Sequence, residues 1–196
     1  MSGQRGYVLQ AQAFTIGHSN YSAEVFMALL TMHRIEVLVD VRSQPYSKYV
    51  PQFNKRQIES VLAIQGIKYL FLGRELGGRP LAPEHYDSDG RVLFTRIAET
   101  QVFLDGMSRL KNGIEKYRVA LMCSEEEPSE CHRHLLLGRV LAKEGISVWH
   151  IRGDGSVQNE EDLARQEAAR GLDYVQADLK LVAGVATIPP AWRRYF

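Results

Sequence analysis

Cysteine is scarce in this chain of 196 residues, which has only Cys123 and Cys131. Two cysteines cannot build the disulfide framework of a small secreted domain, and in the cytosol both are expected to be reduced. Long apolar runs are also missing. No stretch approaches the roughly 18 apolar residues of a membrane span, and the opening "MSGQRGYVLQAQ" has no signal-peptide core. We therefore expect a cytosolic protein with no membrane partner.

The chain has little net charge, because 24 Lys and Arg residues face 23 Asp and Glu residues and leave a formal charge of +1. This balance gives no long-range attraction to phosphate, so nucleic-acid binding would need a local basic surface. Hydrophobic residues make up 45% and charged residues 24% of the chain, which is ordinary globular usage. The length suits one well-buried domain, and nothing in the composition indicates an oligomeric state.

Short apolar runs alternate with segments of helical spacing. The predicted strands are residues 13–17, 37–41, 67–72, 117–123 and 146–151. The predicted helices are residues 22–34, 54–66, 103–116, 130–144 and 159–171, with Ser22, Asn54 and Ser129 as N-terminal caps of the first, second and fourth. Strands that alternate with helices indicate an α/β fold, here a single-domain three-layer α/β/α structure with a mainly parallel sheet of about five strands.

The remaining segments have no such pattern. We expect residues 1–12 to be an N-terminal arm, residues 13–155 to form the α/β domain, and residues 156–196 to be a C-terminal helix and arm packed on it. The helix in "NEEDLARQEAARG" is expected to be charged and exposed. The polar, glycine-bearing stretch 73–91 is too long for a simple connection and is typical of a binding loop or a lid.

In an open parallel sheet, ligands bind beyond the carboxyl ends of the strands. Polar residues at or after the predicted strands are therefore the candidates for a site, and every strand end supplies at least one. The candidate catalytic residues are His18, Asp40, Cys123, Glu125, Cys131 and His132. The candidate ligand-binding residues at these strand ends are Ser19, Arg42, Arg74, Gly77, Gly78 and, from the following helix, Arg133.

The stretch "LMCSEEEPSECHRHLLLGR" carries both cysteines between a strand and a helix. Cysteine phosphatases and sulfur-transferases place a nucleophilic thiol at such a point, above an oxyanion cradle. Nine residues separate Cys123 from Arg133, which is longer than the phosphatase arrangement, and three glutamates make a poor phosphate cradle. Two alternatives stay open: both cysteines are core residues, or they form a structural metal site with His132 and His134. The spacing matches no usual zinc pattern, so we assign no metal ligand. The sequence leaves any cofactor unknown.

The buried strand that ends at Val41 carries two charged residues. Arg42 needs an acidic partner or an anionic ligand there, and Asp40 could form an internal ion pair with Arg42, Arg133 or His18 instead of taking part in catalysis. The section from Arg42 to Arg79 is also the most basic and aromatic of the chain, and it could bind nucleic acid through stacking tyrosines.

Four motifs carry a resemblance to a known family: "FTIGHSNYS", "VLVDVRSQPYSKYVPQFN", "GIKYLFLGRELGGRP" and "VALMCSEEEPSECHRHLLLGRVL". Together they resemble the bacterial and archaeal family called domain of unknown function 488, over most of residues 13 to 152. The resemblance adds Ser47 to the candidate ligand-binding residues. It implies family membership and no activity, since that family has no established one. A partial similarity to rhodaneses, in "LVDVR" and the last motif, supports topology more than sulfur transfer.

The sequence thus favours an enzyme or ligand-binding domain for an anionic small molecule or nucleotide. Arg42 and Arg133 would hold the anion, and His18 or Glu125 would move protons. The alternatives are a nucleic-acid-associated accessory protein and a structural metal-binding protein.

Overall fold

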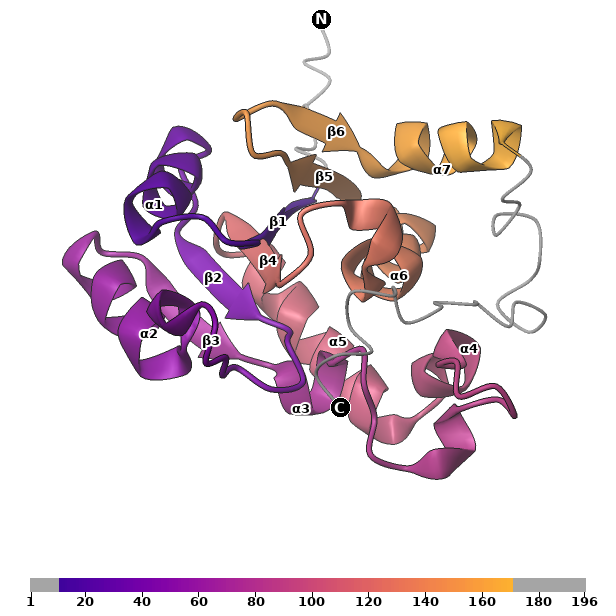
Figure 1. Ribbon diagram of the computed structural model, residues 1–196. Helices are drawn as coiled ribbons and strands as arrows, with labels where there is room; N and C mark the ends of the chain where they lie inside the picture. Colours follow the sequence, from indigo (N-terminus) through magenta and orange to yellow (C-terminus); the bar gives the residue numbers. More distant parts are fainter. Residues whose placement is uncertain (1–10, 171–196) are drawn as a thin grey trace, which may run out of the picture.

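The computed structural model describes residues 11–170. Its centre is one six-stranded sheet in the order β3-β2-β4-β1-β5-β6 (Figure 1). The strands are β1 (Gln12–Gly17), β2 (Val37–Asp40), β3 (Lys68–Phe71), β4 (Val119–Cys123), β5 (Ser147–Ile151) and β6 (Val157–Asn159). The first five pair in parallel, whereas β6 runs antiparallel to β5. The predicted α/β fold with a mainly parallel sheet is confirmed, and the short antiparallel β6 is an addition to it.

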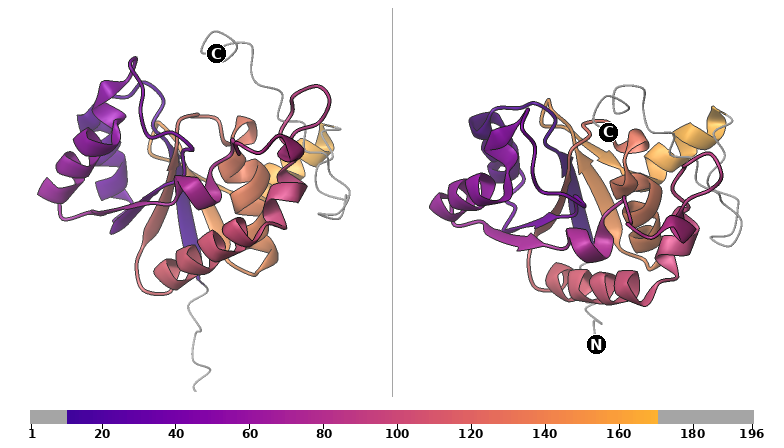
Figure 2. Two further views of the ribbon diagram at one scale, coloured as in Figure 1. Left: turned by 90° about the horizontal axis from the view of Figure 1, so that it is seen from below. Right: turned by 60° about the horizontal axis from the view of Figure 1, so that its bottom comes forward.

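Helices cover both faces of the sheet, as Figures 1 and 2 show. The longer helices are α1 (Ala23–Met32), α2 (Lys55–Ile64), α5 (Gln101–Ile114) and α7 (Glu160–Ala169). The shorter ones are α3 (Gly73–Leu76), α4 (Phe94–Ala98) and α6 (Arg139–Lys143), with single turns η1 (Pro51–Phe53), η2 (Pro83–His85) and η3 (Pro128–Glu130) and the π-helical η4 (Arg133–Gly138).

Two hydrophobic cores lie on opposite faces of the sheet because strand side chains alternate between the faces. In β2, Val37 and Val39 pack in the core with α5, while Leu38 packs in the core with α1 and α2. In β4, Cys123 belongs to the α5 side and Met122 to the other. Strands buried on both faces explain the continuous apolar runs of the sequence.

Ser22 and Asn54 both stand at the predicted helix starts, but only Ser22 caps its helix through its side chain. Ser22 caps α1 through a hydrogen bond from the backbone amide of Val25. Asn54 stands at the start of α2, but its side chain accepts a hydrogen bond from the amide of Ser47 instead of capping the helix. The loop 73–91 contains two short helical turns, α3 and η2.

The helix predicted for residues 130–144 is wrong at its start. Ser129 lies in the turn η3 and does not cap the helix, because Pro128 opens a separate single turn before it. Cys131 is extended, with φ −129° and ψ 143°, so it precedes the helix and is not in its first turn. The helical segment runs from Arg133 through η4 and α6 to Lys143.

The helix predicted after Gly155 is present as α7, but it is not simply exposed. Glu160, Leu163 and Glu167 are buried, because their spacing places them on the one face that packs on β5 and β6. The expected N-terminal arm lies outside the described residues except for residues 11 and 12, and β1 already begins at Gln12. The expected C-terminal arm beyond residue 170 lies outside them altogether. Within residues 11–170 no helix is both long and apolar enough to cross a membrane.

Candidate functional site

The carboxyl ends of β1 and β4 lie side by side at one edge of the sheet. Gly17 is paired with Cys123 in the register, and the amides of His18 and Ser19 donate to the carbonyls of Cys123 and Ser124 at 2.9 and 2.8 Å. Ser19 has a φ of 45°, a left-handed conformation that is costly for a residue with a side chain. The turn after β1 is therefore fixed against the segment after β4.

Four predicted residues meet in what we call the thiol cluster: Cys123, Glu125, Cys131 and His132. The sulfur of Cys123 lies 3.0 Å from Oε2 of Glu125 and 3.6 Å from Nδ1 of His132. The sulfur of Cys131 lies 3.8 Å from the same Nδ1. Both cysteines and His132 are buried, whereas Glu125 is partly exposed. The bend between extended Cys131 and the first helical residues brings these neighbours to one point.

The two thiols have opposite acidities. A hydrogen bond from the Cys131 thiol, against the effect of burial and with help from His132, holds the pKa of Cys123 well below its usual value. Burial, and then the negative charge of Cys123, raises the pKa of Cys131. Cys123 is therefore the more acidic of the two thiols.

The carboxyl and imidazole of the cluster respond to that charge. Burial, and then the adjacent Cys123 sulfur, raises the pKa of Glu125 to about 7. For His132, burial opposes protonation, but its contacts with Cys123, Glu125 and the carbonyl of Val41 outweigh it and raise the pKa. Nε2 of His132 lies 3.2 Å from that carbonyl, so it is the donor there, and Nδ1 faces the sulfurs.

A second group of predicted residues forms an internal ion pair beside the cluster. The guanidinium of Arg42 donates to Asp40 from Nε at 2.9 Å and from Nη2 at 2.6 Å, and Nη2 also donates to the carbonyl of Phe53. Tyr69, which sequence reasoning missed, donates its hydroxyl to Asp40 at 2.7 Å. Asp40 is 0% and Arg42 5% exposed. Of the partners considered for Asp40, the structure shows Arg42 in an ion pair.

His18 completes this group as a neutral side chain. Burial, and then the Arg42 guanidinium, lowers its pKa to about 4. Nε2 therefore accepts from Nη1 of Arg42 at 3.1 Å, Nδ1 donates to the carbonyl of Ser19, and the ring stacks on Phe53. Both ring nitrogens of His18 are thus engaged, so proton transfer by His18 stays a prediction.

Arg133 is fully buried and has hydrogen-bond partners other than those of Arg42. Nη1 donates to the hydroxyl of Thr15, and Nη2 donates to the carbonyl of Glu126, while Nε has no hydrogen-bond partner. Within residues 11–170 no carboxylate forms an ion pair with Arg133. The two arginines predicted to share one anion therefore lie in different hydrogen-bonded groups.

The glycines of the "LGG" motif serve close packing. A Cβ on Gly77 would lie 2.4 Å from the hydroxyl of Ser43, and a Cβ on Gly78 would lie 2.6 Å from Cγ of His132. The segment after α3 thus presses against the imidazole of the thiol cluster. By contrast Arg74 is exposed on α3, and Ser47 accepts a hydrogen bond from the amide of Tyr49 within its own loop. The structure does not bring either of these two residues to the cluster.

Sequence reasoning also missed a chain of buried hydrogen bonds that we call the histidine–glutamate cluster, formed by Thr15, His134, His150, Glu160 and Glu167. The hydroxyl of Thr15 lies 2.7 Å from Nδ1 of His150, whose Nε2 lies 2.8 Å from Glu160. The two nitrogens of His134 lie 2.9 Å from Glu160 and 2.8 Å from Glu167. The spacing of Glu160, Leu163 and Glu167 was a usable signal, since it places two acids beside an apolar residue on one helix face.

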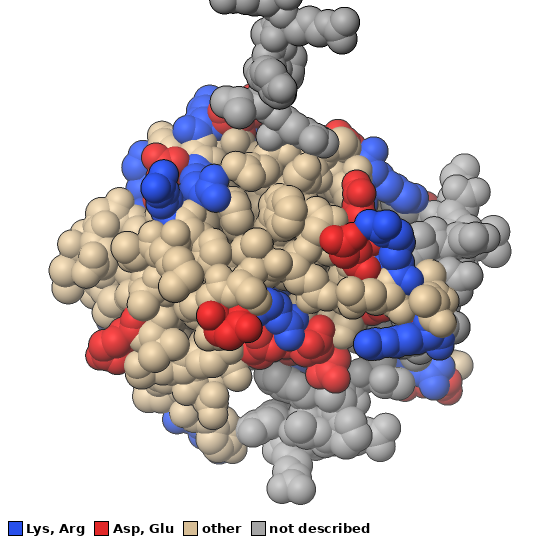
Figure 3. Space-filling model, turned by 90° about the horizontal axis from the view of Figure 1, so that it is seen from above, with Lys and Arg blue, Asp and Glu red and all other residues tan. Residues whose placement is uncertain are grey.

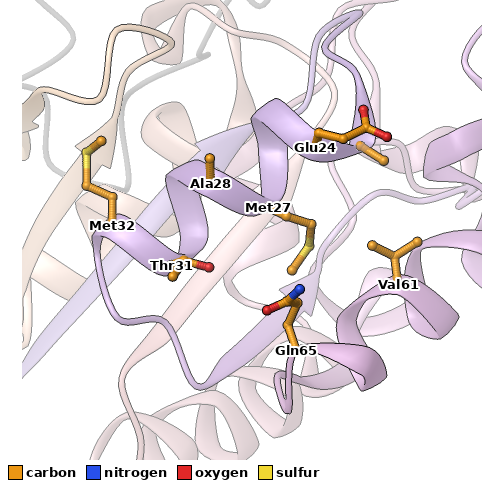
Figure 4. A pocket seen from close by; sticks show the side chains of 8 residues that line it. Glu24, Met27, Ala28, Thr31, Met32, Val61 and Gln65 are labelled. Carbon is orange, nitrogen blue, oxygen red and sulfur yellow. The ribbon is translucent and has the colours of Figure 1, made fainter.

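A surface groove of about 580 Å³ lies between α1 and α2 (Figure 4). It is lined by Ala23, Glu24, Met27, Ala28, Thr31, Met32, Val61 and Gln65. None of the predicted site residues lines this groove. This groove is thus separate from the candidate site residues.

No curated protein and no solved structure matches the chain. The sequence model of one family, described as "Domain of unknown function DUF488", matches residues 22–140. The matched span contains the whole thiol cluster and ends before β5, so His150, Glu160 and Glu167 lie beyond it. Since the match covers more than half of the 196 residues, the chain belongs to the DUF488 family.

Proposed function

We propose that the protein binds one transition-metal ion of the zinc class in the thiol cluster. The observation that carries this proposal is the convergence of three ligand atoms, Sγ of Cys123, Sγ of Cys131 and Nδ1 of His132, all within 4.8 Å of one another and all buried. Thiolate and imidazole are the ligands that zinc prefers in proteins.

The distances between the nitrogen and sulfur ligand atoms match a bound ion better than they match hydrogen bonds. Around a tetrahedral zinc with Zn–S of about 2.3 Å and Zn–N of about 2.0–2.1 Å, a sulfur and a nitrogen ligand lie about 3.6 Å apart. The two distances from Nδ1 of His132, to Cys123 and to Cys131, are 3.6 and 3.8 Å. In the absence of an ion only weak thiol hydrogen bonds span such gaps.

The imidazole is held in the orientation that a ligand needs. Nε2 of His132 donates to the carbonyl of Val41, which leaves Nδ1 as the acceptor, and Gly78 packs against the ring. Metal-binding histidines usually donate their second N–H to such a carbonyl, because this fixes tautomer and ring orientation. Deprotonation of the two thiols would accompany binding, since only thiolates are strong ligands.

The same atoms also suit a cysteine nucleophile, since an acidic Cys123 lies beside His132 and Glu125. That function needs a substrate to reach the sulfur atom itself, and the two cysteines are only 5% and 3% exposed. The predicted anion site has less support, because the charge of Arg42 is matched by Asp40. A buried metal centre needs neither an open cavity nor a free guanidinium.

Elemental analysis of the purified full-length protein tests the proposal. We expect about one zinc-class ion per chain, and loss of that ion in Cys123→Ala and in His132→Ala. Ser124→Ala, next to Cys123 but outside the cluster, is the matched control and should keep the ion. A wild-type protein that stays metal-free after incubation with Zn²⁺, with both thiols open to alkylation, would refute a metal centre.

A second candidate function is nucleic-acid binding by the loop after β2. Tyr46 and Tyr49 are 72% and 59% exposed, and Nζ of Lys48 lies 5.0 Å from the Tyr49 ring centroid. The bases of a single strand stack on exposed aromatic side chains, and basic side chains bind its phosphates. On the face seen from above in Figure 3, by contrast, basic and acidic side chains lie intermixed.

We expect binding of a labelled single strand that weakens steeply with salt, because bound phosphates release counterions. Tyr46→Ala with Tyr49→Ala should weaken it without affecting metal content. If wild-type protein does not bind the strand at low salt, this second function is excluded.

A further inference from the structure

We infer that the fourth coordination position of the proposed metal centre, at Glu125, is exchangeable and accepts a small anionic ligand. This inference rests on the proposed function, because it assigns a role to one corner of the same site. Three protein ligands with one open position distinguish catalytic zinc sites from structural ones, which are closed by four.

The geometry separates Glu125 from the other three residues. Oε2 of Glu125 lies 3.0 Å from the sulfur of Cys123, whereas an oxygen and a sulfur bound to one tetrahedral ion lie about 3.5 Å apart. The distances from His132 to both sulfurs already match such an ion. The carboxylate would therefore have to move to become a ligand, whereas His132 already lies at ligand distance from both sulfurs.

Glu125 also differs from the other three residues of the thiol cluster in its burial. Cys123, Cys131 and His132 are 5%, 3% and 8% exposed, but Glu125 is partly exposed. Its backbone is held in place, since a Cβ on Gly17 would lie only 1.7 Å from the Glu125 carbonyl. The side chain is therefore the part that would have to swing for an incoming ligand to replace it.

The neighbouring charges favour an anion at that position. A divalent ion with two thiolates and a neutral imidazole has no net charge. Arg133, directly after His132, adds a buried positive charge for which residues 11–170 supply no ion pair. Glu126 and Glu127 do not offset it as an ion pair, because Arg152 binds both carboxylates at 3.0 and 2.8 Å. With Glu125 protonated, an anionic fourth ligand brings this group of charges to balance, and a neutral one does not.

The chemistry that follows is Lewis-acid activation of a small anionic substrate or of water. If water or the protonated form of the ligand displaced it, Glu125 would remain beside the position as the carboxylate that accepts the proton. In this role the anionic ligand that the sequence predicts would bind near Glu125 and Arg133. The arginine acts through its charge, since its Nη atoms donate to Thr15 and Glu126.

Cobalt-substituted full-length protein with azide as the probe tests the inference. Co²⁺ reports its own coordination through its visible spectrum. We expect azide to change the spectrum of wild-type protein, and to bind at least tenfold more tightly to Glu125→Ala, in which no carboxylate competes. Glu125→Gln gives a second, conservative variant, and Glu126→Gln is the matched control with wild-type azide affinity.

The outcomes are distinct. One cobalt per chain with a spectrum that azide leaves unchanged, in wild type and in both Glu125 variants, would overturn the exchangeable position and leave the metal centre standing. Loss of cobalt from both Glu125 variants, as complete as in Cys123→Ala, would also overturn it, since Glu125 would then be an obligatory ligand. Absence of cobalt from the wild-type protein would refute the proposed function itself.

Discussion

The thiol cluster and the histidine–glutamate cluster are both buried groups of three or more metal-ligating side chains, yet their internal distances differ. In the thiol cluster the separations from Nδ1 of His132 to the two sulfurs are 3.6 and 3.8 Å. In the histidine–glutamate cluster each nitrogen–oxygen separation from His134 or His150 to Glu160 or Glu167 is 2.8 or 2.9 Å. The first set of gaps fits an ion between the atoms, and the second fits a proton.

Proton positions in the second cluster follow from this difference. Burial disfavours a charge on His134, but the carboxylates of Glu160 and Glu167 outweigh it and raise its pKa, so that both nitrogens donate. Burial lowers the pKa of His150, which is neutral, donates to Glu160 and accepts from Thr15. Nitrogen and oxygen ligands around zinc would lie about 3.3 Å apart. The distances in the histidine–glutamate cluster are thus those of a hydrogen-bonded network and not of a metal site.

The largest expected effect of this difference is on stability in the presence of zinc. Zn²⁺ at about a thousand times its Kd should stabilise metal-free protein by about 4 kcal/mol, which raises Tm by roughly 8–16 °C for a domain of this size. Cys131→Ala should lose the whole gain, while Glu160→Gln should keep it. An equal gain in Cys131→Ala would show that the ion binds elsewhere. Scanning calorimetry at fixed zinc concentration measures it.

Next in size is the loss of a charge from the histidine–glutamate cluster. Glu160→Gln leaves a protonated His134 with one carboxylate partner, and breaking such a buried pair costs about 3–5 kcal/mol. Denaturant unfolding of metal-free protein measures this loss. Glu161→Gln, on the exposed side of α7, is the matched control and should change stability by less than about 0.5 kcal/mol. A stability of Glu160→Gln equal to that control would contradict the assigned ion pairs.

The dependence of stability on acid pH also tests the histidine–glutamate cluster. Burial acts to raise the pKa of Glu160, but hydrogen bonds from His134 and His150 outweigh it and lower the pKa from 4.5 to about 2. The folded-state pKa is depressed, so Glu160 contributes about 3 kcal/mol above pH 4.5. That contribution is lost as the pH falls from 4.5 towards 2. Denaturant titrations across this range should show the loss in wild type and a shallower one in Glu160→Gln.

The smallest expected effect comes from Thr15, which joins the second cluster to Arg133. Thr15→Val removes the hydroxyl at nearly constant volume and leaves Nδ1 of His150 and Nη1 of Arg133 without this partner. We expect a loss of about 1–3 kcal/mol in unfolding free energy. Zinc affinity should stay within about threefold, because Thr15 contacts no ligand of the proposed centre. A larger fall in affinity would mean that the two clusters are coupled through Arg133.

Much of the fold could be predicted because it follows from local patterns. A strand that is buried on both faces needs apolar residues at successive positions, and "VLV" at the start of β2 and "VALMC" in β4 supply them. Ser22 before α1 follows from the need to satisfy free amides at a helix start. The short strand β6 was not predictable in this way, because three residues, Val157 to Asn159, give no pattern and owe their strand form to pairing with β5.

The sequence predicted which residues belong to the candidate site better than it predicted how they are arranged. The strand-end rule selects Cys123, Glu125, Arg42 and His18 because parallel strands bring their carboxyl ends to one edge. It could not tell that Asp40 and Arg42 bind each other or that Arg133 turns towards Thr15. Sequence spacing also argued against a metal site, since the single turn η3 and the bend after Cys131 are not visible in it.

The sequence by itself determined the alternation of strands and helices, the scarcity of cysteine and the polar residues that follow each strand, because these depend on neighbours within a few positions. Only the tertiary structure decided which polar residues meet. Cys123 and His132 come together across a loop, and His134 contacts Glu160 and Glu167 on a helix far along the chain. The distance between the ligand atoms in each cluster then decides whether an ion or a proton fits between them. Distances between side chains from separate elements arise from packing, and no local pattern encodes them.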